Sequence, residues 1–351
     1  MKDRYDELRR ASWNLPAGMQ KLAVLEEMIR IADLYLTEED AYDIRMDYTQ
    51  AASDAGRSER MLVSFAWCLA KFEQHPDKHS EFSLLWYYKW ILNMIWKLPE
   101  LSLGQVDGVF EHFRTRYESR GYSLRPYYQQ LVHYRLSQGQ PAEAQEAYKL
   151  WRATPRDQLA DCRACEQNLF GDYHFTIGHL KRGMQALKPI LDGRMRCHAL
   201  PQNTYSLVLF PYFVQGDTKK AAEVAGKAFR ELQGPEYLEE YAVLLEYLAL
   251  TDLPKAAKLY DRTIGYGVEC RLGWTRLHYF YAVRQFLREW HKTRRRKRLA
   301  LSDRVSEEWA DREVNEQLRR FDERNGNTAV SDRFAAKEQQ YLKLRAREAS
   351  R

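Results

Sequence analysis

The stretch VLFPYFVQGDTKKAAEVAGKAF, residues 208–229, joins an apolar run to an amphipathic run through a glycine. Gly216 predicts the end of a first helix, because glycine readily adopts the left-handed conformation that terminates many helices. Ala221 follows five residues later, and its small side chain allows a second helix to pack closely against the first. The stretch therefore predicts a helical hairpin.

The same pattern occurs in three other segments of the chain. The breaks between the two runs recur at intervals of 39, 38 and 35 residues and lie at Gly139, Gly178, Gly216 and Thr251. The small residues five positions after each break are Ala144, Gly183, Ala221 and Ala256. The three further segments are LVHYRLSQGQPAEAQEAYKLW (131–151), LFGDYHFTIGHLKRGMQALKPI (169–190) and VLLEYLALTDLPKAAKLYDRTI (243–264). A repeat of this length predicts helical hairpins that stack one on the next.

This spacing resembles the tetratricopeptide repeat (TPR), a helix pair that recurs every ~34 residues. The resemblance is clear over residues 123–264 and degenerate over 41–76, where a glycine break is present without the small residue. It implies an all-α fold, a right-handed α-solenoid of stacked helical hairpins. No stretch alternates apolar and polar residues for long enough to predict a sheet.

The repeat pattern divides the chain into three parts. We expect degenerate N-terminal hairpins over 1–122, TPR-like repeats with a terminal helix and a basic end over 123–298, and a charged C-terminal helix and tail over 299–351. A docking helix is predicted through residue 321, and disorder is predicted past Asn325 because the apolar content falls there. The run FDERNGN (321–327) is similar to a tail of bacterial TPR proteins.

The concave face of such a solenoid is suited to an extended peptide or a helix of a partner protein. Counting ten and six residues back from each break gives the positions expected on that face. They are Gln129, His133, Asn168, Asp172, Ser206, Phe210, Tyr241 and Leu245. The alternative is that these side chains pack between repeats. The repeat pattern favours a scaffold that binds a protein or peptide.

Three of the five cysteines are expected to meet at one edge of the stack. Cys162 and Cys165 precede one predicted hairpin, and Cys197 precedes the next. Positions one period apart are neighbours in a solenoid, so three thiols and His198 would provide four ligands for a structural zinc. His174 and His179 are alternatives for the fourth ligand. The competing interpretation is that these cysteines are ordinary half-buried residues without a metal.

The sequence contains none of the common catalytic motifs. Phosphate-binding glycine loops, the G-x-S-x-G nucleophile turn and the H-E-x-x-H zinc helix do not occur. Redox chemistry at Cys162 and Cys165 is disfavoured, because no strand precedes the pair. We therefore expect no enzymatic activity.

A basic run near residue 292 offers an alternative function. Residues 271–351 hold 21 Lys and Arg against 12 Asp and Glu, whereas the preceding residues hold 34 against 37. Such a run could neutralise phosphates of a nucleic acid, or it could be a solvated helix end. The residues that would make the phosphate contacts are Lys292, Arg294, Arg295, Arg296, Lys297 and Arg298.

The stretch FSLLWYYKWILNMIWKLP (82–99) approaches the length of a membrane span. Lys89 lies near its centre and Asn93 is close by, so a buried helix is favoured over a span. The charged N-terminus MKDRYDELRR lacks the features of a secretory signal. We expect a cytoplasmic protein without a membrane partner.

Overall fold

The computed structural model describes residues 1–293 and 298–350. Within these residues the chain forms 17 α-helices and one short 3-10 helix, and it contains no strand. The expected all-α fold is therefore confirmed. The elements are α1 (Lys2–Trp13), α2 (Met19–Tyr35), α3 (Glu38–Asp54), α4 (Ser58–Gln74), α5 (Glu81–Ile95), α6 (Leu103–Ser119), α7 (Arg125–Ser137), α8 (Pro141–Ala153), α9 (Arg163–Thr176), α10 (Leu180–Leu191), α11 (Gln202–Val214), α12 (Thr218–Glu231), η1 (Pro235–Tyr237), α13 (Leu238–Thr251), α14 (Leu253–Glu269), α15 (Gly273–Lys292), α16 (Glu307–Asn325) and α17 (Ala329–Ala349).

The predicted breaks coincide with helix ends. Gly139, Gly178 and Gly216 have φ angles of 74°, 80° and 84°, the left-handed conformation that a side chain opposes. At the fourth break, α13 ends at Thr251 and α14 begins two residues later. The breaks therefore separate α7 from α8, α9 from α10, α11 from α12, and α13 from α14.

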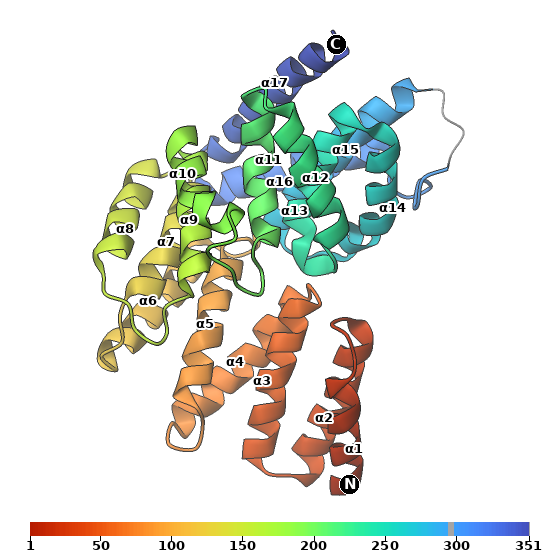
Figure 1. The fold of residues 1–351 in the computed structure, drawn as a ribbon. Helices are drawn as coiled ribbons and strands as arrows, with labels where there is room; N and C mark the ends of the chain where they lie inside the picture. The colour runs from red at the N-terminus through yellow and green to blue at the C-terminus, as the bar shows by residue number, and fades with distance from the viewer. Residues whose placement is uncertain (294–297, 351) are drawn as a thin grey trace.

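Small residues allow the helices of each pair to approach closely. Ala144, Ala221 and Ala256 are fully buried. A Cβ atom at Gly183 would lie 2.4 Å from the ring of Phe175, so only glycine fits in α10 at this crossing. The first helices of successive pairs also contact one another, α9 with α11 and α11 with α13. These contacts make a row of helix pairs (Figure 1).

Segments far apart in the sequence meet where α3 approaches η1. Gly56, just after α3, lies against the ring of Pro235, and Arg57 forms an ion pair with Glu269. Figure 1 shows α3 and α4 beneath α13 and α14 at this point. We call this the closing contact.

The prediction of disorder past Asn325 is wrong, because residues 329–349 form helix α17. Val330, Phe334, Tyr341 and Leu344 are its buried residues and are spaced along one face. Most of the other residues of α17 are charged, polar or alanine, so its mean hydropathy is low and its composition resembled that of a disordered tail.

Helix α17 and the turn before it also bond to the carboxyl ends of two other helices. Arg333 donates to the carbonyl of Leu136 in α7 (2.6 Å), and Arg347 donates to the carbonyl of Phe213 in α11 (2.8 Å). Asn325 donates to the carbonyl of Ser137 (3.1 Å). The last carbonyls of a helix accept no hydrogen bond from within that helix. These side chains donate the hydrogen bonds that water would otherwise have to supply.

Helix α5 is a buried helix, as expected. The side chain of Lys89 is fully buried, and its Nζ donates to Asp161 Oδ1 at 2.7 Å and to the carbonyl of Leu159 at 2.8 Å. Among the described residues, none of the helices combines the length and the apolar character that crossing a bilayer requires.

Candidate functional site

Two cavities lie side by side among the first helices of the pairs. The first has a volume of about 340 Å³ and is lined from α5, α7, α9, α11, α13, α15 and α17. The second has a volume of about 520 Å³ and reaches the closing contact, where Gly56 and Pro235 line it. The residues that line both are Asn93, Lys97, Asn203, Glu239 and Glu240. Because these walls are shared, we treat the two cavities as one candidate site.

Glu239 is the ionised carboxylate of the site. Lys97 Nζ donates to its Oε1 at 2.8 Å, and Thr275 Oγ1 donates to the same oxygen at 2.7 Å. Burial by itself would raise the pKa of Glu239, but the charge of Lys97 and these hydrogen bonds outweigh it and lower the pKa to about 2. Glu239 therefore stays negatively charged at neutral pH.

Glu240, the next residue, behaves in the opposite way. Burial, followed by the negative charge of Glu239, raises the pKa of Glu240 to about 8. No lysine or arginine of the described residues forms a salt bridge with it. At neutral pH this carboxyl is mostly protonated, and a positive charge brought close to it would favour its ionised form.

A histidine and an aspartate face each other in the first cavity. His133 Nδ1 lies 3.5 Å from Asp172 Oδ2. Burial raises the pKa of Asp172 and lowers that of His133. A neutral His133 ring with its proton on Nδ1 would direct that proton toward Asp172 and leave Nε2 as an acceptor. In the part of the chain that the structure describes, His133 Nε2 is buried without a protein hydrogen-bond partner.

His278 and Arg333 complete the first cavity. Burial, followed by the charge of Lys337, lowers the pKa of His278 to about 3, so this ring is neutral. The ring of His278 packs 5.1 Å from Trp274 and 5.0 Å from Phe334. Helix α17 thus contributes both a packing residue and a cation to the cavity.

The structure brings together four of the eight positions expected on the concave face. His133, Asn168, Asp172 and Ser206 all line the first cavity. The remaining positions pack inside the protein: Gln129, Tyr241 and Leu245 are buried, and Phe210 is half-buried, with its ring 6.3 Å from Phe213.

Four important residues of the site were not selected from the sequence, namely Lys97, Glu239, Glu240 and His278. Glu239 and Glu240 stand in the first turn of α13, where acidic residues are common for electrostatic reasons alone. Lys97 follows α5, outside the repeat register. The sequence has three other Glu-Glu pairs, at 26–27, 38–39 and 307–308, so this pair gave no distinguishing signal.

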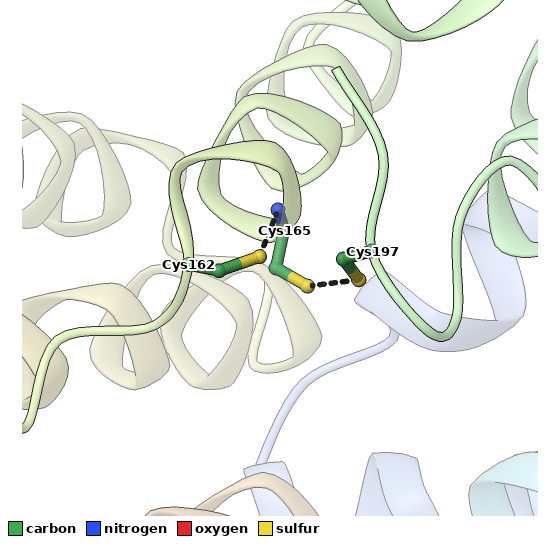
Figure 2. Close-up of side chains that lie close together, drawn as sticks. All are labelled: Cys162, Cys165 and Cys197. Carbon is green, nitrogen blue, oxygen red and sulfur yellow. Dashed lines mark hydrogen bonds between the residues drawn. The ribbon is translucent and has the colours of Figure 1, made fainter. Parts of the chain in front are cut away.

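Three thiols form a second cluster, at the amino end of α9. Cys165 Sγ lies 3.2 Å from Cys197 Sγ, and Cys162 Sγ accepts a hydrogen bond from the Cys165 amide at 3.3 Å (Figure 2). All three sulfur atoms lie within 4.8 Å of one another. This arrangement could hold a metal ion, since thiolates are preferred ligands of several soft or borderline metals.

The thiols differ in acidity. Burial raises the pKa of Cys165, and the neighbouring thiols add to the effect. Burial also opposes ionisation of Cys162, but hydrogen bonds from the Cys165 and Ala164 amides at the helix start and from the two neighbouring thiols together outweigh it and lower the pKa of Cys162. Cys162 is therefore the thiol most ready to bind a cation.

His198 is not part of this cluster. It is exposed, and its electrostatic interactions are with Asp54 and Glu236. Cys197 and Leu200 enclose a tight turn, in which the amide of Leu200 donates to the carbonyl of Cys197 at 3.2 Å, and His198 lies in that turn, exposed to solvent. The alternative ligand His174 lies instead beside Tyr148, at 3.3 Å from its hydroxyl. Among the described residues, the cluster consists of the three cysteines.

The basic run is only partly described. Lys292 forms a salt bridge with Glu289 at 2.9 Å, and Arg298 is exposed. Arg294, Arg295, Arg296 and Lys297 lie outside the described residues. Nucleic-acid binding through this run stays a prediction.

Comparison with protein-family models and with curated proteins gives no match for this chain. The function is therefore argued from the geometry of the cavities and the thiol cluster.

Proposed function

We propose that the chain is a non-enzymatic scaffold that binds a segment of a protein partner at the two cavities. The proposal includes a right-handed α-solenoid of TPR-like hairpins, with the first helices facing the guest. One observation carries it. His133 and Asp172 each lie six residues before a break, and Asn168 and Ser206 each lie ten residues before one. All four line the same cavity, from the successive first helices α7, α9 and α11. Repeat proteins build binding surfaces in this way, from equivalent positions of successive repeats.

The chemistry of the walls suits a polypeptide guest. Asn93 and Asn203 line both cavities, so amide groups are available to pair with a peptide backbone. Asn203 Oδ1 is buried and has no protein hydrogen-bond partner in the described part of the chain. Volumes of about 340 and 520 Å³ match single side chains or short segments better than a whole helix.

The proposal assigns no chemical reaction to the site. The carboxylate of Glu239, which is the ionised member of the pair, is already occupied by Lys97 and Thr275. These contacts make it a fixed part of the wall. We place the protein in the cytoplasm, where thiols stay reduced and available for a metal.

Photo-crosslinking tests the proposal. A photoreactive residue replaces Ser206 in the first cavity, and a control places it at Lys227, exposed on α12. After irradiation in the native host, mass spectrometry should find one protein attached through Ser206 and not through Lys227, with the attachment mapped to one segment. Asn203→Leu should reduce that attachment. Equal labelling from both positions, or none from Ser206, would refute the proposal.

We also propose that Cys162, Cys165 and Cys197 hold a structural zinc ion. Three thiolates provide three of the four ligands that such a site needs, and Cys162 is exposed, so a water or a partner group can supply the fourth. The ion would join the start of α9 to the loop between α10 and α11.

Metal analysis tests this second proposal. Protein purified without a chelator should contain about one equivalent of zinc, and Cys165→Ser should lose it. Cys68→Ser is the matched control, because Cys68 is buried away from the cluster. Less than about a tenth of an equivalent in the unmodified protein would reject zinc at this site.

A further inference from the structure

The charged side chains that line the two cavities do not balance. Four are carboxylates and two are cations, and the two histidines are neutral, so full ionisation would leave two negative charges. The carboxylates are Asp172, Glu236, Glu239 and Glu240, and the cations are Lys97 and Arg333. Glu236 is exposed and the other three carboxylates are half-buried, so these three lose part of their hydration and are stabilised by a positive partner.

The two cations are already engaged. Lys97 is bound to Glu239. Arg333 donates to the carbonyl of Leu136, which does not neutralise its charge, and that charge favours the ionised form of Asp172 without a direct ion pair. In the described parts of the chain, neither Glu240 nor Asp172 has a salt bridge to a lysine or arginine. Of the four carboxylates, only Glu239 therefore has a lysine or arginine ion pair from the described residues, and Asp172 has the more distant charge of Arg333.

Aromatic rings line the same cavities as these carboxylates. Trp96 and Trp274 line the first cavity, with their ring centroids 5.4 Å apart, and Trp90 and Tyr266 line the second. Aromatic faces attract cations through the electrons of the ring. Lys97 lies 5.5 Å from the Trp96 ring, so such a contact is already present in this wall.

We propose that the cavities bind a protonated amine or guanidinium group, with Glu240 and Asp172 as its counter-charges and the tryptophan and tyrosine rings as its apolar walls. Two buried acceptors add hydrogen bonds: Nε2 of His133 and Oδ1 of Asn203. The cation is either a free organic amine or a lysine or arginine side chain of the partner segment. The inference depends on the proposed function only if the cation is a side chain of the partner segment.

Proton release provides a specific signature. Four titratable groups lie around Glu240. Lys97 stands in the turn after α5, Glu236 stands in η1, and Glu239 precedes Glu240 on the same helix. Tyr266 of α14 lines the second cavity together with Glu240. Since its pKa is raised to about 8, roughly nine-tenths of Glu240 is protonated at pH 7. A bound cation favours the ionised form, so each binding event should release up to about one proton.

Calorimetry on the full chain tests the inference. The probe is n-butylammonium chloride, and n-butanol, which has the same shape without the charge, is its control. Titrations at constant ionic strength in two buffers of different ionisation enthalpy measure the released protons. We expect butylammonium to bind, butanol not to bind, and close to one proton to be released at pH 7.

Variants locate the site. Glu240→Gln keeps the shape of the side chain and should weaken butylammonium binding at least about tenfold and abolish proton release, since bonds to charged groups are the stronger ones. Asp172→Asn is a second variant in the first cavity. Glu223→Gln, on the exposed face of α12, should leave both readouts unchanged. Circular dichroism confirms that each variant is folded.

The outcomes separate the two sources and the two proposals. A short lysine peptide that binds more tightly than butylammonium, together with crosslinking through Ser206, supports the partner's side chain. Butylammonium binding without any crosslinked partner supports a free amine as the ligand. That result refutes the scaffold proposal and leaves the cation inference standing. If butylammonium binds no better than butanol, or if Glu240→Gln binds it equally well, the cation inference is wrong even where a partner is crosslinked.

Discussion

Replacing Lys89 by methionine should destabilise the protein by about 3 kcal/mol. Its side chain is fully buried, with Nζ 3.4 Å from the Trp86 ring centroid and bonded to Asp161 and to the carbonyl of Leu159. Methionine retains the apolar stem but removes the charge. The carboxylate of Asp161 then lacks its cation, and the carbonyl loses a donor.

The magnitude follows from the surroundings of Asp161. Removing one member of a buried ion pair costs about 3–5 kcal/mol, because the other charge is left uncompensated. Asp161 is 22% exposed and still accepts a hydrogen bond from Gln129 Nε2 at 2.6 Å, so the lower end of that range applies. Adding Asp161→Asn removes the charge while keeping an acceptor, and it should recover part of the loss.

Urea unfolding followed by far-ultraviolet circular dichroism measures the change. Lys149→Met is the matched control, since Lys149 and Glu146 form an ion pair in which the side chains are 60% and 66% exposed. Exposed pairs contribute little, so the control should change the free energy of unfolding by less than about 0.5 kcal/mol. A loss below about 1 kcal/mol for Lys89→Met, or equal losses for both variants, would refute the reasoning.

Three other predictions follow from the packing and from the cavity. Phe334→Ala should lower the free energy of unfolding by about 3 kcal/mol, because this buried ring holds α17 in place; unchanged urea unfolding would show that α17 is not docked. Gly171→Ala should cost about 1–2 kcal/mol, since the added Cβ would lie 2.5 Å from Leu187 Cδ2, and a thermal midpoint equal to that of the unmodified protein would contradict this contact. Glu240 has a pKa near 4.5 when unfolded and about 8 when folded, so the stability from its protonated form is complete below pH 4.5 and is lost as the pH rises through 8. Glu240→Gln should therefore raise the thermal midpoint at pH 9 but not at pH 4, and a gain of the same size at both pH values would exclude this titration.

The helix boundaries were predictable because they depend on local backbone requirements. Gly139, Gly178 and Gly216 each end a helix in the left-handed conformation, and Ala144 and Ala221 each allow a close crossing. These requirements place glycine and alanine at a fixed spacing in the sequence, where the pattern can be recognised. The pairing of Lys89 with Asp161 leaves no such trace, because 72 residues separate the two.

The candidate site was only partly predictable for the same reason. The repeat register led to His133, Asp172 and the three thiols, which occupy equivalent places in successive pairs. Lys97 lies outside that register and meets Glu239, 142 residues further along the chain. His198 was expected beside the thiols, but the chain direction after Cys197 carries it away.

Helix α17 was missed because its docking depends on distant backbone carbonyls. Arg333 and Arg347 donate hydrogen bonds to backbone carbonyls at the ends of α7 and α11. Because every residue has such a carbonyl, the sequences of these two helices do not predict the contact. Arginines in a charged stretch are normally solvated, so only the assembled fold identifies these two as structural.

The closing contact bears on how quickly a guest exchanges. Gly56 and Pro235 meet without a covalent link between their neighbouring helices, and both belong to the wall of the second cavity. The ion pair beside them joins Arg57 to a 60% exposed Glu269, so dissolved ions screen it, unlike the buried apolar contacts between helix pairs. Rising salt concentration should loosen this wall selectively. Residence time in the second cavity would then shorten while the helix pairs keep their structure.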